Sequence, residues 1–288
     1  MGSIIALVVT LLIAFIVAIY ISRVVAHRSV SKLRLAGINK LEVLKRLLTH
    51  IQQHRGLSNG ELNGDTQLKC RVEEVGKEVG KDWEELELID SSFKDNERFI
   101  GTYTHWNRLK VRYSGLAVSN NLEQHSRLIM NLLYLIEDVA ESHDLDFIRS
   151  DVRGSEVIWK ELLETAESIG QIRALGTGIV AAGGCDSIQR IRVRFLNDKI
   201  KRMLKELITG LQCSLDNGSS RHVILPLLDN VKKTENSILE LVALNETELF
   251  NTQGRGITSE DYFSLASRCM EPLMALFDEG LNRLKPLV

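Results

Sequence analysis

The chain has 288 residues and a formal net charge of −2, so it carries no overall positive field that would attract nucleic acid. It has only three prolines and 6% aromatic residues, while leucine, isoleucine and charged residues abound, a composition that favours helices over sheets. Four widely spaced cysteines lack any metal-binding pattern with histidine and are typical of reduced thiols: Cys70, Cys185, Cys213 and Cys269. We therefore expect an all-α protein without a metal or other cofactor.

The N-terminal segment is almost wholly apolar from Ile4 to Ile21. At 1.5 Å per residue, a helix of this length crosses a bilayer core of about 30 Å. A cleaved signal peptide would carry basic residues before a shorter apolar core and an Ala-x-Ala-like site, whereas no basic side chain precedes Ile4. The sequence therefore predicts an uncleaved transmembrane anchor over residues 1–23 and a single-pass protein of the cell inner membrane.

A basic juxtamembrane segment, residues 24–35, follows the predicted span. The positive charges on this side of the span are Arg23, Arg28, Lys32 and Arg34. By the positive-inside rule, the positively charged flank of a span stays in the cytoplasm. The sequence therefore predicts a cytoplasmic location for the bulk of the chain.

The remaining chain shows apolar residues at spacings of three and four, which indicates amphipathic helices. We expect helices over residues 38–58, 66–99, 122–143, 157–173, 187–211, 223–249 and 258–284, with a less regular stretch over 102–119. The second should break at Gly76 or Gly80, and its acidic run from Asp82 to Glu87 should face solvent. Short connections between about eight helices predict two antiparallel four-helix bundles, in halves 36–146 and 151–285, with Asp151 opening the second.

Two short motifs repeat at a distance of 118 residues. Arg55 to Gly60 and Arg173 to Gly178 both read Arg-x-Leu-small-small-Gly. Gly56 and Gly60 fit a helix C-terminus, which would place Arg55 in the last turn of its helix. A cation there is also stabilised by the helix dipole, so a structural role for this arginine stays open.

The first motif resembles a known family signature. Gln52-Gln53-His54-Arg55-Gly56-Leu57-Ser58 is similar to the motif of the nitrate- and nitrite-sensing domain, in which Glu-Arg-Gly is usual and His54 replaces the glutamate. The resemblance covers residues 36–285 and implies an all-helical sensor, with arginines of both halves holding a small oxyanion.

The resemblance assigns ligand-binding positions to Arg55, Gly56 and Arg173. It also implies a further arginine late in the second half, for which we choose Arg268, with Arg255 as the rival. His54 either adds a titratable cation or indicates that the ligand differs.

Arginine suits such a ligand because a planar guanidinium matches two oxygens of nitrate or nitrite. A single exposed ion pair is worth only about 0–1 kcal/mol, so two or three arginines must converge in a partly dry cleft. We predict a membrane-anchored sensor that binds the anion between its halves and passes a helix shift to a second copy of itself or to a separate signalling partner. Catalytic triads, zinc motifs and kinase motifs are missing from the sequence, so an enzyme is not expected.

Two alternatives remain at this stage. The chain could be a membrane-anchored scaffold that binds protein partners and no anion. It could also be an adaptor in which basic residues between Arg190 and Lys205 contact lipids or an acidic partner, although they spread around their helix. A phosphate-binding loop at Gly176–Gly184 is disfavoured because no Gly-Lys-Ser/Thr follows. Small residues there instead predict a close approach of two helices or of backbone to a ligand.

Overall fold

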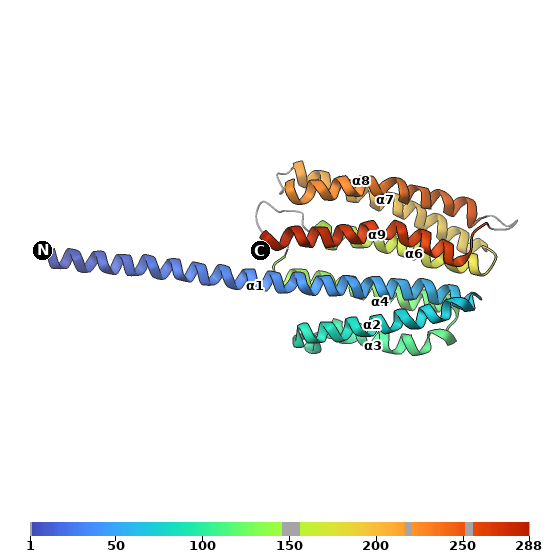
Figure 1. The fold of residues 1–288 in the computed structure, drawn as a ribbon, viewed down its shortest axis with the longest axis horizontal. Helices are drawn as coiled ribbons and strands as arrows, with labels where there is room; N and C mark the ends of the chain where they lie inside the picture. Colours follow the sequence, from blue (N-terminus) through green and yellow to red (C-terminus); the bar gives the residue numbers. More distant parts are fainter. Residues whose placement is uncertain (1, 146–155, 217–220, 251–255, 288) are drawn as a thin grey trace.

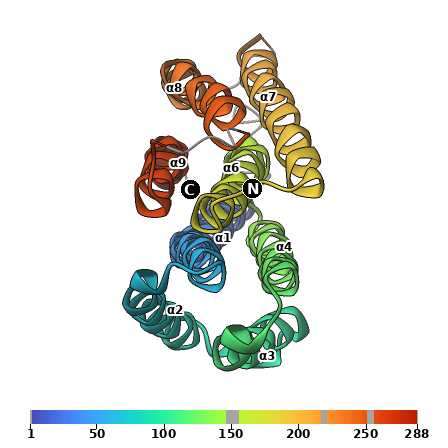
Figure 2. The same ribbon diagram turned by 90° about the vertical axis from the view of Figure 1, so that its right-hand side faces the viewer.

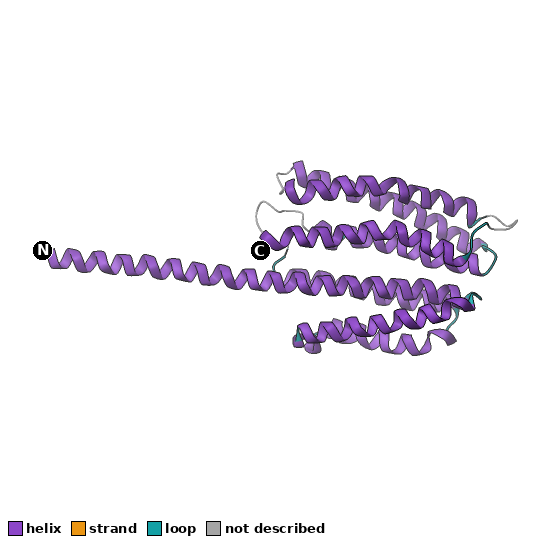
Figure 3. Ribbon diagram, viewed as in Figure 1, coloured by secondary structure: helices purple, strands orange, loops and turns teal. Residues whose placement is uncertain are grey.

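The computed structural model describes residues 2–145, 156–216, 221–250 and 256–287. Within these ranges the regular secondary structure consists of helices and contains no strand, which confirms the all-α prediction (Figure 3). The predicted starting point of the second half, Asp151, and the rival site residue Arg255 lie outside the described residues.

The first four long helices form an antiparallel bundle: α1 (Gly2–Leu62), α2 (Lys69–Ile89), α3 (Glu97–Arg112) and α4 (Val118–Ser142). The apolar stripe predicted for the first of them is confirmed, since Leu41, Leu44 and Ile51 are completely buried. In the end-on view, α2 and α3 lie on the outer side of this bundle and α1 and α4 on its inner side (Figure 2).

The second bundle contains the later helices α6 (Glu161–Ala181), α7 (Ser187–Asp216), α8 (Arg221–Glu248) and α9 (Ser259–Leu284), preceded by the short α5 (Glu156–Trp159). Helix α9 begins where the sequence predicts, because the Thr258 side chain accepts a hydrogen bond from the Asp261 N–H. Pro226 and Pro272 lie inside α8 and α9 and divide neither helix. The two bundles meet where α6 packs along α1 (Figures 1 and 2).

Helix α1 is one continuous element from the N-terminal apolar segment into the first bundle (Figure 1). Its apolar side chains over residues 11–21 are exposed, and by length and composition this part of α1 is a candidate membrane span. The anchor, the basic segment and the first bundle helix expected from the sequence are thus consecutive parts of a single rod.

The second helix departs from the sequence-based expectation. Helix α2 runs unbroken through Gly76 and Gly80 and ends at Asp90, whose side chain accepts a hydrogen bond from the Ser92 N–H and starts a 3₁₀ turn (Ser91–Asp95). A competing Asp side chain ends the helix, while glycine is tolerated inside it.

Two further expectations for this region are wrong in part. The stretch over 102–119 is regular helix as far as Arg112, where α3 ends, and is less regular only after it, where a 3₁₀ turn (Tyr113–Gly115) leads to the start of α4 at Val118. Asp82 does not face solvent with the rest of its acidic run: it is 3% exposed and binds the Arg46 Nε and His50 Nδ1 atoms of α1, each at 2.6 Å. A buried carboxylate requires such partners, which the spacing of charges along one helix does not reveal.

Candidate anion-binding site

Arg55 lies in the interface between the bundles rather than at a helix end. Helix α1 continues for seven residues beyond it to Leu62, and the Arg55 side chain is completely buried. Gly56 does not end the helix; a Cβ atom there would lie 2.7 Å from the Phe263 ring of α9, so glycine permits close packing of α1 against α9. The helix-dipole explanation for Arg55 therefore does not apply.

The Arg55 guanidinium is held by a carboxylate of the other bundle. Its Nη1 and Nη2 atoms donate to the Glu167 Oε1 and Oε2 atoms of α6 at 2.6 and 3.1 Å, a two-point contact. The side-chain amides of Gln52 and Gln171 donate to the same carboxylate at 2.8 and 2.9 Å. Gly170 makes room for this arrangement, because a Cβ there would lie 2.9 Å from the Arg55 Nη2 atom.

Arg173 is the second buried guanidinium of the site and has far fewer partners. Its side chain is 2% exposed, donates through Nη1 to the Ser267 hydroxyl at 2.8 Å, and lies over the Phe263 ring with Cζ 4.7 Å from the ring centroid. Burial and, to a smaller extent, the positive charge of Arg55 lower the pKa of Arg173 to about 9, against the opposing effects of Glu167 and Glu271.

Several buried donors of this pair have no hydrogen-bond partner in the structure: Arg55 Nε, Arg173 Nε and Arg173 Nη2. A buried donor left unpaired costs about 1–3 kcal/mol, and more when it is charged. The Arg173 Nε atom would also lie 3.7 Å from a Cβ at Gly56, the residue next to Arg55. The two repeated motifs thus place incompletely bonded arginines beside each other.

His54 faces the other side of α1. The His125 Nδ1–H donates to the Asn121 carbonyl at 2.9 Å, which leaves His125 Nε2 as the acceptor for the His54 Nδ1–H, also at 2.9 Å. The His54 ring stands edge-on to Trp106, with centroids 4.9 Å apart. Burial lowers the pKa of His54 to about 4, so this imidazole is neutral at pH 7.

The remaining candidate arginine is elsewhere. Arg268 is exposed on α9, although its neighbour Ser267 contacts Arg173. The structure therefore brings Arg55, Gly56 and Arg173 together and leaves Arg268 in solvent.

The sequence-based reasoning missed Glu167. Its signal was available, because Glu167 shares a helix face with Leu163 and Ala174 and is a carboxylate where the pattern otherwise requires apolar or small residues.

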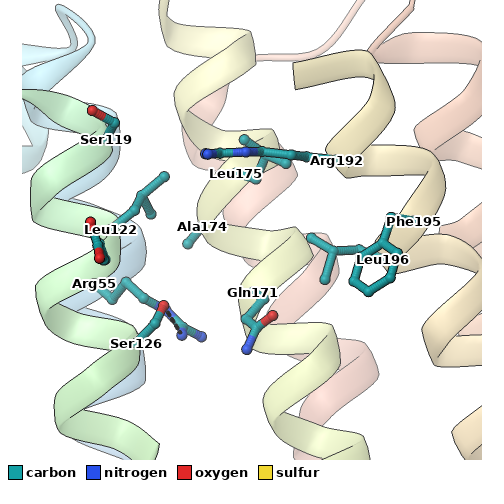
Figure 4. A pocket seen from close by; sticks show the side chains of 11 residues that line it. Arg55, Ser119, Leu122, Ser126, Gln171, Ala174, Leu175, Arg192, Phe195 and Leu196 are labelled. Carbon is teal, nitrogen blue, oxygen red and sulfur yellow. Dashed lines mark hydrogen bonds between the residues drawn. The ribbon is translucent and has the colours of Figure 1, made fainter. Parts of the chain in front are cut away.

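A cavity of about 540 Å³ reaches Arg55 from the outside (Figure 4). It opens between α4, α6 and α7, and both Ser126 and Gln171 line it next to the guanidinium. The rest of its lining is mixed: Ser119, Leu122, Glu123, Ala174, Leu175, Arg192, Phe195 and Leu196. Because the Ser126 hydroxyl lies 3.4 Å from Arg55 Nη1, this cavity gives a small solute a path to the site.

Comparison with known proteins places the chain in a family. A family model described as nitrate and nitrite sensing matches residues 46–279, a range that contains Arg55, Glu167 and Arg173 and parts of both bundles. No curated protein and no solved structure matches the chain. Because the family model covers most of the sequence, including both buried arginines, the chain belongs to the nitrate- and nitrite-sensing family.

Proposed function

We propose that the protein senses nitrate or nitrite by binding the anion between Arg55 of the first bundle and Arg173 of the second. The observation that carries the proposal is the set of unpaired donors on two adjacent, fully buried guanidiniums. Unpaired buried donors on a cation are destabilising, and an anion with several equivalent oxygens would pair them.

The charges of the site favour a monovalent ligand. Arg55, Arg173 and Glu167 together carry one net positive charge, and the pKa of the neighbouring His54 is too low for it to add another at pH 7. Nitrate or nitrite would bring this set to neutrality, whereas sulfate would leave one buried negative charge in excess. Burying an unbalanced charge is costly, so the site should discriminate against divalent oxyanions.

The same charges make the site a switch. Without an anion, the two guanidiniums repel each other and only Arg55 is neutralised, by Glu167. An anion that bridges them would draw α1 toward α6 and α9, the helices that carry Arg173 and its partner Ser267. A coupling free energy of about 1–3 kcal/mol is typical of such transitions and changes a partner's affinity several-fold.

The continuity of α1 supplies a route for the signal. Arg55 lies 34 residues after Ile21 on one unbroken helix, a distance of about 51 Å at 1.5 Å per residue. We place the anchor at residues 1–23 in the inner membrane and, because Arg23 and Arg28 follow the apolar stretch, both bundles in the cytoplasm. The recipient of the shift is then a second copy of the chain or a separate protein at the membrane.

Calorimetric titration of the full chain in nonionic detergent tests the proposal. We expect nitrate and nitrite to bind and sulfate and chloride to bind much more weakly. Arg173→Met, which removes the unpaired donors without leaving a buried carboxylate, should abolish binding. Arg202→Met is the matched control, because Arg202 is an exposed arginine of α7, and it should bind as the unchanged protein does.

A folded protein that binds none of the four anions would refute the sensor proposal and favour a membrane-anchored scaffold. Binding that survives in Arg173→Met would instead show that the anion occupies another place.

A further inference from the structure

A second cavity of about 540 Å³ opens on the outer side of the first bundle, between α3 and α4. Ten residues line this groove, among them His105, Arg108, Arg112, Gln124 and Arg127. Three are arginines, three are side-chain amides and none is acidic. Acidic residues outnumber basic ones in the chain as a whole, so a groove whose charged lining residues are all basic is unusual for this protein.

The charges in the groove are poorly balanced by the protein itself. Arg108 and Arg112 are exposed and four residues apart on α3, a like-charge spacing that destabilises a helix. No ion pair is described for either of them in the ranges that the structure covers. Arg127 pairs with Glu123 at 2.5 Å, but both side chains are more than half exposed, so this contact neutralises little.

His105 joins the two walls of the groove. Its Nε2–H donates to the Gln124 Oε1 atom across the helices at 2.9 Å, which leaves Nδ1 free to accept or take up a proton. Burial lowers the pKa of His105, the Gln124 contact opposes this, and the positive charges of Arg108 and Arg127 lower the pKa further. The ring therefore lies within the field of both guanidiniums, on the same side of the bundle.

We propose that this groove binds a soluble small molecule that carries phosphate groups. Guanidinium forks match phosphate oxygens at two points, and three of them around one groove require a ligand with several negative charges. The amides of Asn120, Gln124 and Asn131 supply neutral donors between the cations. The groove volume lies within the range of about 300–1,000 Å³ typical of small-molecule sites and exceeds what a single nitrate or nitrite needs.

The position of the groove argues against a lipid headgroup as the source of the phosphate. Gln124 precedes His125, which hydrogen-bonds to His54, so the groove lies level with position 54 of α1. That level is 33 residues beyond Ile21, or about 50 Å along the helix from the candidate span. The charge of a bilayer surface is screened over a Debye length of about 8 Å, so at this distance it attracts the groove only weakly.

The groove is also separate from the candidate nitrate site. Consecutive residues of α4 face different surroundings: Gln124 lines the groove, His125 contacts α1, and Ser126 lines the cavity that leads to Arg55. Helix α4 therefore stands between the two, and the proposal does not depend on nitrate binding.

The test is calorimetric titration of the full chain in nonionic detergent with inorganic pyrophosphate, at ~0.15 M salt to screen weak surface attraction. We expect saturable binding that Arg108→Gln/Arg112→Gln weakens roughly tenfold or more, because two charge-assisted contacts are lost. The matched control is Lys201→Gln/Arg202→Gln, which removes the same charge from exposed positions of α7 and should leave affinity within about twofold.

Arg173→Met provides a second control and should retain pyrophosphate binding. The absence of binding at millimolar pyrophosphate would overturn the proposal. Equal losses in the two double variants would overturn it as well, since they would show attraction by net charge alone. Loss in Arg173→Met would assign the pyrophosphate to the buried arginines instead.

Discussion

At the scale of single residues, Arg173 combines a stability cost with a binding role. A buried guanidinium with two unpaired nitrogen atoms is destabilising unless something else pairs it. Its acidic neighbours do not compensate fully: the Glu167 carboxylate is engaged by Arg55, and Glu271 is exposed to solvent. Proteins keep such residues where function needs them, at the expense of stability.

We therefore predict that Arg173→Met raises the free energy of unfolding by about 1–3 kcal/mol when no anion is present. Denaturant unfolding in detergent measures this, and nitrate should stabilise the unchanged protein but not the variant. Arg202→Met, on the surface, should change stability by less than about 0.5 kcal/mol. If Arg173→Met were less stable than the unchanged protein, the favourable packing of Arg173 on Phe263 would outweigh the cost of burying its charge.

His54 makes a pH-dependent contribution at the same scale. Its folded-state pKa of about 4 lies below the usual 6.5, so the unfolded chain binds the proton more readily and acid favours unfolding. The contribution is complete above pH 6.5 and is lost as the pH falls toward 4, by roughly 3 kcal/mol in total. His125 acts in the same direction, because burial lowers its pKa too.

Unfolding free energies at neutral pH and near pH 4.5 check this prediction. The unchanged protein should lose stability between neutral pH and pH 4.5. In His54→Gln this loss should be smaller by most of the roughly 3 kcal/mol, because glutamine does not titrate and still has a donor for His125. The control His27→Gln alters an exposed ring on α1 and should leave the pH dependence unchanged. An identical pH dependence in His54→Gln would contradict the assignment.

At the scale of helices, glycines set how closely α6 approaches its neighbours. A Cβ at Gly176 would lie 2.2 Å from the buried Tyr262 ring of α9, and one at Gly178 would lie 2.2 Å from the Asn59 amide of α1. Tyr262 cannot easily move, because its hydroxyl donates to Asn245 at 2.6 Å. The small residues of the second motif thus serve the close helix packing that their pattern predicts.

Gly176→Ala should accordingly destabilise the protein by about 1–3 kcal/mol, the usual cost of overpacking. The same change at Gly101, a helical position with no neighbour within 4 Å of the added Cβ, should instead stabilise by about 0.5–1 kcal/mol through helix propensity. Thermal melts of the two variants compare them directly, and equal shifts would show that α6 adjusts to the extra atom.

Helical periodicity predicted the buried faces well and the ends of helices poorly. The stripe through Leu44 and Leu48 depends on spacing within one helix, so the sequence alone reveals it. The ends of α1 and α6 depend on contacts between helices: glycines that resemble helix caps accommodate Phe263 and Tyr262 instead. For the same reason both arginines could be singled out from the sequence, whereas the contact of Arg55 with Glu167, 112 residues away, emerged only from the fold.

At the scale of the whole molecule, continuous helix α1 joins the N-terminal segment to the bundles. The side of the membrane on which the bundles lie can therefore be tested. One helix carries the candidate span, the basic residues after it and Arg55, so the proposed single span would put both bundles on the same side of the membrane as those basic residues. The protein also provides its own probes of that side, because Cys70 in the first bundle and Cys213 in the second are exposed.

We predict that a membrane-impermeant maleimide labels neither exposed thiol in intact cells and labels both once the inner membrane is permeabilised. The positive-inside rule is the physical reason, since moving Arg23 and Arg28 across the bilayer is unfavourable. Cys70→Ser/Cys213→Ser should remove most of the signal, because Cys269 is buried and Cys185 is only partly exposed. Labelling in intact cells would place the bundles outside the cytoplasm, where the anion would be sensed before it enters the cell and α1 would carry the signal inward.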